Sequence, residues 1–146
     1  MENNMKIEID ARLENVGIVR VAITAMMSSL QVTIDEIMDV KTAASEAVTN
    51  SIEHGYYNIE GKVIIEAKTT TVDNMDYIMI KVSDKGLGIE DIDLATTPTY
   101  TTKPEMEHAG MGFTIMETFM DEVVIESELG EGTVITLTKR INSRKS

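Results

Sequence analysis

Five segments of the chain carry the hydrophobic patterns of β-strands. In the first, Ile7 and Ile9 alternate with polar neighbours, which is the period of two expected of a half-buried strand. Asp73-Asn74 and Gly130-Glu131-Gly132 are turn sequences, so each should join two consecutive strands. The predicted strands are Lys6–Ala11, Lys62–Thr71, Tyr77–Ser83, Glu122–Ser127 and Thr133–Thr138.

Apolar residues at helical spacing predict helices over Val16–Leu30 and Gly112–Met120. Between them, Thr33 and Glu36 match a capping box, which predicts that a long helix starts there. Gly55 is well placed to end it. The stripe of this helix that we expect to be buried consists of Ile34, Ile37, Met38, Ala44, Val48 and Ile52.

The order of these elements predicts one α+β domain over residues 1–146. Consecutive strands joined by short turns favour a mostly antiparallel sheet, and helices that come in groups should cover one of its faces. The expected architecture is a two-layer sandwich. Its other sheet face is free for solvent or a partner subunit.

Composition narrows the function classes. The chain has no cysteine, which excludes disulfides and thiolate metal sites, and its formal net charge of -12 argues against direct binding of nucleic acid. It has no apolar run long enough to cross a bilayer and no signal-peptide pattern at the start, so we expect no membrane and a cytoplasmic location. The basic run from Lys139-Arg140 to Arg144-Lys145 is predicted to be a frayed tail.

Polar residues line one side of the predicted long helix. Glu46, Asn50 and His54 are spaced by four residues, which places them together on the helix surface. A carboxylate and an amide one turn apart can hold a hard metal ion and orient a hydroxyl beside it. A solvated helix face has the same pattern, and from these three residues alone it is the favoured reading.

Two glycine-rich segments add candidate chemistry. Asp84-Lys85-Gly86-Leu87-Gly88 follows a strand, where Asp84 could accept a hydrogen bond from an exocyclic amine and the glycines allow close approach of a ligand. Gly110-Met111-Gly112 is expected to open a helix, whose free N–H groups suit phosphates. An ordinary turn and a simple helix start are equally good explanations of each segment taken singly.

Between these two segments, Ile89–Pro104 is turn-rich and predicts a short helix followed by a loop. Its second half, Thr96–Pro104, is the candidate for a lid that closes over a nucleotide, with Lys103 near the phosphates. An unstructured loop of this length is uncommon unless it is functional or disordered, which favours the lid.

Taken in this order, the segments resemble the GHKL ATPases, the superfamily of gyrase, sensor histidine kinases and mismatch-repair ATPases. Glu46–Gly55 is similar to their N box, and Asp84–Ile89 to their adenine-binding box. Gly110–Phe113 is similar to their second glycine box, and Glu131–Val134 to their final hairpin. The similarity covers nearly the whole chain.

A narrower resemblance is to the anti-sigma-F serine kinases of spore-forming bacteria. It runs through Thr101–Glu107, Gly110–Glu117 and Phe119–Val123, which include positions that ATP binding alone would not dictate. The resemblance implies a homodimer that binds the sporulation sigma factor F when loaded with ATP. It also implies a kinase that uses Mg²⁺ and ATP, yields ADP, and phosphorylates a serine of the anti-anti-sigma protein.

The same resemblance implies roles at the reacting end of the site. Glu46 would be the base that orients or deprotonates the serine hydroxyl, and Asn50 would be the Mg²⁺ ligand. Gly110 and Gly112 would offer N–H groups to the phosphates. His54, which could be mistaken for a phosphoacceptor, is expected to be a helix-end residue instead.

At the other end of the site, the resemblance implies that Asp84 reads the adenine amino group, with Thr133 nearby. Gly86 and Gly88 would let the chain pass the base and the sugar. Arg20 matches an arginine with which the family contacts its protein partners.

One position departs from the family pattern, because His108 stands where the family has a lid arginine. An arginine is always charged and could hold the γ-phosphate with two hydrogen bonds, whereas a histidine is neutral for much of the time near pH 7. We expect Lys103 and backbone N–H groups to compensate, with slower transfer. This departure leaves open an ATP-gated sigma-binding module with little kinase activity. A second alternative is a related stress-response anti-sigma kinase, which has the same chemistry and a different partner.

Overall fold

The computed structural model describes residues 2–56, 60–86, 88 and 104–141. Five strands form one sheet in the order β1-β2-β3-β5-β4, and every neighbouring pair is antiparallel. The alternation seen in the sequence is present in the structure, since every second residue is buried from Val63 to Thr69 in β2 and throughout β3. The strands are β1 (Glu2–Asp10), β2 (Lys62–Val72), β3 (Met75–Asp84), β4 (Glu122–Glu128) and β5 (Gly132–Ile141).

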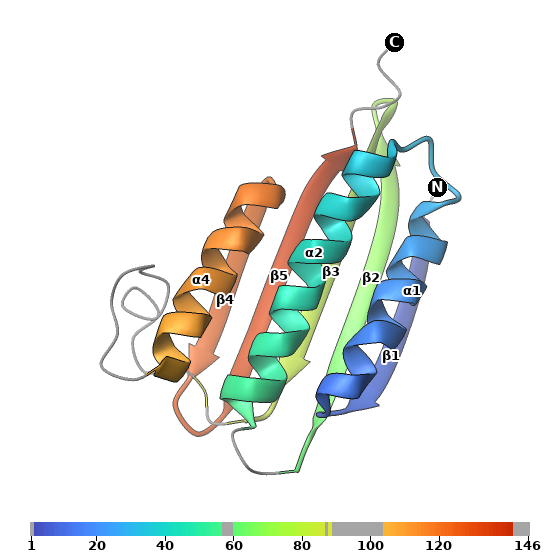
Figure 1. Ribbon diagram of the computed structural model, residues 1–146. Helices are drawn as coiled ribbons and strands as arrows, with labels where there is room; N and C mark the ends of the chain where they lie inside the picture. Colours follow the sequence, from blue (N-terminus) through green and yellow to red (C-terminus); the bar gives the residue numbers. More distant parts are fainter. Residues whose placement is uncertain (1, 57–59, 87, 89–103, 142–146) are drawn as a thin grey trace.

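Three helices, α1 (Val16–Met27), α2 (Ile34–Asn50) and α4 (Pro104–Phe119), lie side by side on the same face of the sheet (Figure 1). The buried apolar side chains of these helices and of the inner sheet face form the core. No helix of the described residues covers the other face (Figure 1). The predicted two-layer α+β sandwich is confirmed.

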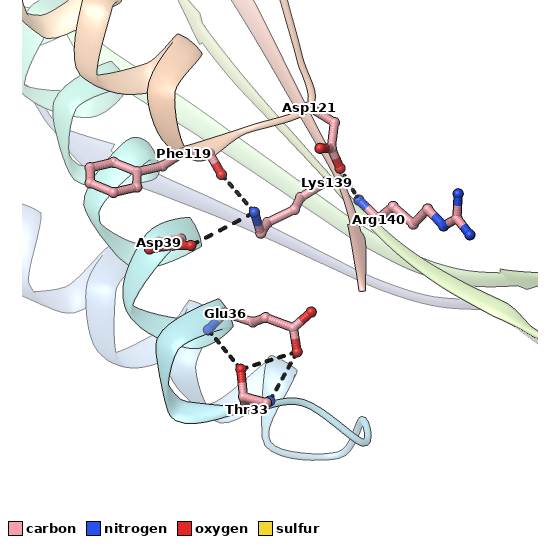
Figure 2. A network of polar contacts seen from close by, with 7 residues as sticks. All are labelled: Thr33, Glu36, Asp39, Phe119, Asp121, Lys139 and Arg140. Atoms are coloured by element: carbon pink, nitrogen blue, oxygen red, sulfur yellow. Dashed lines mark hydrogen bonds and ion pairs between the residues drawn. The ribbon is translucent and has the colours of Figure 1, made fainter. Parts of the chain in front are cut away.

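The start of α2 is as predicted. The Thr33 hydroxyl accepts a hydrogen bond from the backbone N–H of Glu36 at 3.1 Å, and the Glu36 carboxylate accepts one from the backbone N–H of Thr33 at 3.0 Å (Figure 2). The helical segment also ends at Gly55, but its last turn, Ser51–Gly55, is a π-helix. Such turns inside helices occur frequently at functional sites.

The predicted buried stripe of α2 is partly wrong. Ile34 is 79% exposed and Met38 is 45% exposed, so both face solvent. The fully buried positions include small residues that the sequence interpretation passed over, because alanine is a weak hydrophobic signal although it lets a helix lie close to a sheet. The fully buried apolar positions of α2 are Val40, Ala43, Ala44, Ala47 and Val48. Ala44 and Val48 belong to the predicted stripe, whereas Val40, Ala43 and Ala47 do not.

Several element boundaries differ from prediction, and two of the differences change the interpretation. Helix α4 begins at Pro104 and not at Gly112, because proline suits the first turn of a helix and the residues that follow continue it. At the C-terminus, Lys139 and Arg140 belong to β5 and are not part of a frayed tail.

Strand β5 is anchored by these two basic residues. The Lys139 ammonium donates a hydrogen bond to the Phe119 carbonyl at 2.8 Å and lies 3.8 Å from the Asp39 carboxylate (Figure 2). The Arg140 N–H donates to the Asp121 carboxylate at 2.7 Å. Lys139 thus joins β5 to α2 and to the C-terminal end of α4.

No helix of the described residues is long and apolar enough to cross a membrane.

Candidate functional site

The C-terminal half of α2 and the middle of α4 meet at Gly112. A Cβ atom added there would lie 2.9 Å from Nδ2 of Asn50 and 3.3 Å from Oε2 of Glu46. The absence of a side chain at Gly112 is therefore what lets α4 lie directly against these two polar groups. Three of the predicted site residues are brought together here, from segments about sixty residues apart.

Within this cluster, Asn50 is 8% exposed. Among the described residues, its buried Nδ2 atom has no hydrogen-bond partner. A buried amide without a partner is costly in a folded protein, typically about 1–3 kcal/mol. Rotation about the last bond of the side chain exchanges the amide nitrogen and oxygen of Asn50, so a ligand can meet either atom.

Glu46 is half buried beside Asn50. Burial raises the pKa of its carboxyl above the usual range, and the negative charge of Glu53 raises it further. A carboxylate with a raised pKa is a better proton acceptor than an ordinary one. His54 lies in the π-helical end of the segment, 3.9 Å from the Glu53 carboxylate, as expected of a helix-end residue.

Asp84 closes β3 and is 6% exposed. Its carboxylate accepts a hydrogen bond from the backbone N–H of Gly86 at 2.9 Å. Burial raises its pKa, while the Gly86 N–H, the Ser51 hydroxyl and the Thr133 backbone N–H act in the opposite direction. Since Ser51 follows Asn50 directly, the Asp84 carboxylate lies next to the end of α2.

Thr133 lies opposite Asp84 in the ladder between β3 and β5 and is also buried. Its hydroxyl is 2.7 Å from that of Ser127 on β4. The backbone of Gly132 lies against that of Asp84, because a Cβ at Gly132 would come within 2.2 Å of the Asp84 carbonyl oxygen. The end of β3, the start of β5 and the end of β4 therefore lie in contact next to Asp84.

Gly88, the next described residue after Gly86, has a φ of +77°, which is in the left-handed region. A Cβ at Gly88 would lie 2.1 Å from the Glu128 carbonyl oxygen. The chain after Asp84 therefore passes so close to the β4–β5 turn that only glycine fits.

The structure thus brings together most of the predicted site. Glu46, Asn50 and Gly112 form one group and Asp84, Gly86, Gly88 and Thr133 a second, with Ser51 between them. Arg20 is exposed on α1, outside both groups. Lys103, the lid Thr96–Pro104 up to the start of α4, and the short helix expected within Ile89–Pro104 lie outside the described residues, as does the side chain of His108.

One feature of the prediction is wrong. Gly110 and Gly112 do not open α4 but lie well inside it, so in this arrangement their N–H groups face the preceding turn of the helix. Their phosphate-binding role stays a prediction. What Gly112 does in the described structure is to allow the contact with Asn50 and Glu46.

A divalent ion would find few protein ligands here. The described residues contain no group of three or more histidine, cysteine, aspartate or glutamate side chains arranged for a metal. Mg²⁺ often takes only one or two oxygen ligands from the protein and the rest from phosphates and water. The Asn50 amide oxygen would be the one protein ligand of such an ion, and the neighbouring Glu46 carboxylate would stay free as a base.

Sequence interpretation missed three residues of the site: Ser51, Tyr56 and Ser127. Ser51 and Tyr56 fall in or directly after the segment that resembles the N box. Nothing in their spacing predicts that Ser51 lies beside the Asp84 carboxylate, or that the Tyr56 hydroxyl bonds to the backbone of Lys62 and Lys85. Ser127 is paired with Thr133 only through the sheet register.

A hollow of about 360 Å³ lies on the open sheet face, away from all these residues.

Comparison with known proteins agrees with this geometry. The family model described as the histidine kinase-like ATPase domain matches residues 9–139. The anti-sigma F factor of Clostridium kluyveri is 52% identical over 142 residues, which cover 97% of this chain and 97% of that protein. The anti-sigma F factor of Geobacillus thermodenitrificans is 46% identical over 146 residues, which cover 100% of this chain and 98% of that protein.

Among solved structures, the RsbU and RsbW domains of a Mycobacterium tuberculosis protein superpose with a TM-score of 0.61 at 23% identity. The match covers 95% of this chain but 32% of that one, so this chain spans about a third of its length. At that identity the likeness concerns the fold alone.

The fold and the site define a histidine kinase-like ATPase domain. By its identity to these relatives over nearly their full length, the chain belongs to the family of anti-sigma F factors within that class.

Proposed function

We propose that this protein binds Mg-ATP and, in that state, binds and inhibits the sporulation sigma factor F. We further propose that it phosphorylates a serine of the anti-anti-sigma protein. The observation that carries the proposal is the convergence of Glu46, Asn50 and Gly112 with the buried Asp84. The names of relatives at 44–52% identity support the choice of sigma factor F.

The nucleotide would lie with its base at Asp84 and its phosphates at the contact of α2 with α4. A buried carboxylate acceptor suits the C6 amine of adenine, whereas guanine in the same orientation would place its C6 carbonyl, a second acceptor, against it. Thr133, Gly86 and Gly88 frame the same end. Lys103 and Gly110 remain the proposed phosphate contacts from the lid and from α4.

The transfer itself needs positioning and one base. The serine Oγ attacks the γ-phosphorus, the bond from that phosphorus to the β–γ bridging oxygen breaks, and ADP leaves with the electron pair. Glu46 accepts the hydroxyl proton. Mg²⁺, held in part by Asn50, would neutralise phosphate charge when bound.

Two surfaces are proposed for protein partners. On α1, Arg20 is exposed beside Ile18 and Val21, which are 54% and 70% exposed, so a cation and apolar surface are offered together. On the open sheet face, Met79 and Val124 are 44% and 40% exposed. We assign α1 to the sigma factor and the anti-anti-sigma protein, and the open sheet face to the homodimer.

The deciding experiment mixes the protein with Mg-ATP and the anti-anti-sigma protein and measures phosphoserine. Glu46→Ala should lower the transfer rate by at least about a hundredfold while ATP binding survives, because only the base is lost. Glu117→Ala, an exposed glutamate on α4, is the matched control and should transfer normally.

Undiminished transfer by Glu46→Ala would refute the assignment of the base. If the unaltered protein transfers no phosphate but still binds the sigma factor only with ATP, the second function holds: an ATP-gated binding module. The His108 position gives that alternative its support, because a neutral histidine there would stabilise the transferring phosphate less than arginine.

A further inference from the structure

The buried hydroxyl of Tyr56 lies at the point where β2 and β3 separate. Tyr56 is 7% exposed and follows the π-helical turn directly, with its own N–H donating to the Ser51 carbonyl at 3.1 Å. Its hydroxyl accepts a hydrogen bond from the backbone N–H of Lys85 at 2.7 Å and donates one to the Lys62 carbonyl at 2.7 Å.

The register of the sheet shows that these two hydrogen bonds take the place of a pair in the β2–β3 ladder. Val63 pairs with Asp84 in the β2–β3 ladder, so the next pair along would be Lys62 with Lys85. At that position the Tyr56 hydroxyl stands between the N–H of one strand and the carbonyl of the other. It completes both hydrogen bonds while it holds the strands too far apart to bond directly.

The Tyr56 ring packs against the backbone of Gly61. A Cβ at Gly61 would come within 2.3 Å of the ring, so the backbone of Gly61 lies flat against Tyr56. A bulky residue at 61 would displace the ring and with it the hydroxyl. Both bonds of the hydroxyl therefore depend on a fixed ring position.

We propose that Tyr56 is a positioning residue for adenine recognition. By opening the ladder directly after Asp84, its hydroxyl sets where the chain departs from β3, and so where the Asp84 carboxylate, to which the Gly86 N–H donates, faces the base. The same residue is covalently continuous with the helical segment that carries Glu46 and Asn50. It therefore couples the position of the base-binding strand end to the end of α2. This inference rests on the proposed ATP binding.

The test is Tyr56→Phe, which keeps the ring and removes only the hydroxyl, with Tyr77→Phe as the matched control. Tyr77 lies toward the opposite end of β3 and on the open face. Affinities for ATP and GTP are measured by calorimetry. We expect Tyr56→Phe to weaken ATP binding about tenfold and to reduce the preference for ATP over GTP, with the control unchanged.

The preference ratio separates positioning from general loosening, because a uniformly less stable site would lose affinity for both nucleotides alike. An unchanged ratio and affinity in a folded Tyr56→Phe would overturn the inference. If the unaltered protein binds no ATP, the proposed function fails instead.

Should Tyr56→Phe not fold, amide exchange of Lys85 in the unaltered protein takes its place. Protection as strong as that of the neighbouring ladder amides supports the bridge, and exchange at the rate of an open loop contradicts it.

Discussion

The two ends of α2 treat their polar groups differently. At the N-terminal end, the Thr33–Glu36 capping box satisfies both partners, and farther along Lys139 is bonded to Phe119 and lies near Asp39 (Figure 2). At the C-terminal end, the Asn50 amide nitrogen is buried without a partner among the described residues, and burial raises the pKa of Glu46 and Asp84.

The difference indicates separate tasks for the two ends. Polar groups that only stabilise a fold are paired within it, because an unpaired buried group costs free energy. Groups that bind a ligand lack a hydrogen-bond partner, or are buried away from water, until the ligand is bound. Substitutions at the N-terminal end should therefore change stability and leave nucleotide binding intact, and substitutions at the C-terminal end should do the reverse.

The largest contrast is expected within β3, which carries two buried aspartates. Asp84→Asn should weaken ATP binding about a hundredfold. One oxygen still accepts from the Gly86 N–H, and the other becomes an NH₂ donor that cannot accept a hydrogen bond from the adenine amine. Its melting temperature should hold or rise near pH 7. A raised carboxyl pKa means that the folded state disfavours the charged form, and asparagine removes that cost.

Asp76→Asn is the matched control at the other end of β3. Asp76 accepts a hydrogen bond from the Thr71 hydroxyl at 2.6 Å, far from the site. This variant should melt earlier and bind ATP normally. The contrast between the two aspartates is contradicted if both variants lose affinity for ATP, or if Asp84→Asn lowers only the melting temperature.

Gly112→Ala should have the next largest effect. The new Cβ would press on Asn50 and Glu46, so α4 must move away from α2, and we expect roughly tenfold weaker ATP binding with about 1–3 kcal/mol of destabilisation. Gly17→Ala in α1 meets nothing within 4 Å and should raise stability slightly without affecting ATP. Calorimetry and thermal melting distinguish the two.

Thr33→Ala removes the cap of α2 and should lower the free energy of unfolding by about 1 kcal/mol. Because the cap is at the far end of the helix, ATP affinity should stay the same. Urea denaturation measures the first quantity and calorimetry the second. A loss of affinity would show that the two ends of α2 are not independent.

The smallest effect concerns pH. Activity should fall on acidification at a pH above the ordinary range of glutamate, as Glu46 becomes protonated. Glu53→Gln removes the second cause of the raised pKa and should move this acidic limb to lower pH. Burial, the larger cause, remains, so the limb should not reach the value of a free glutamate. Glu66→Gln on the open face should leave the profile in place.

The sheet, its hairpins and the α2 cap were predictable because each rests on local signals: alternation, turn residues and a capping box. The start of α4 was not, since the glycines at 110 and 112 weigh against a helix that tertiary packing nevertheless forms. Spacing and position singled out Glu46, Asn50 and Asp84 as candidates, while the resemblance gave them roles and added Thr133 and Arg20. The proximity of the site residues, and the bridge made by Tyr56, depend on sheet register and helix packing, which no local pattern carries.

The central claim is that one nucleotide is held where the end of α2, the end of β3 and the middle of α4 meet. Titration of ¹⁵N-labelled protein with Mg-ATP, followed by NMR, tests it most directly. The account predicts saturable shifts of the Asn50 side-chain amide and of the Gly86 and Gly112 backbone amides, all with one dissociation constant. Shifts confined to the open-face hollow around Lys68 and Lys81, or no saturable shift at all, would contradict it.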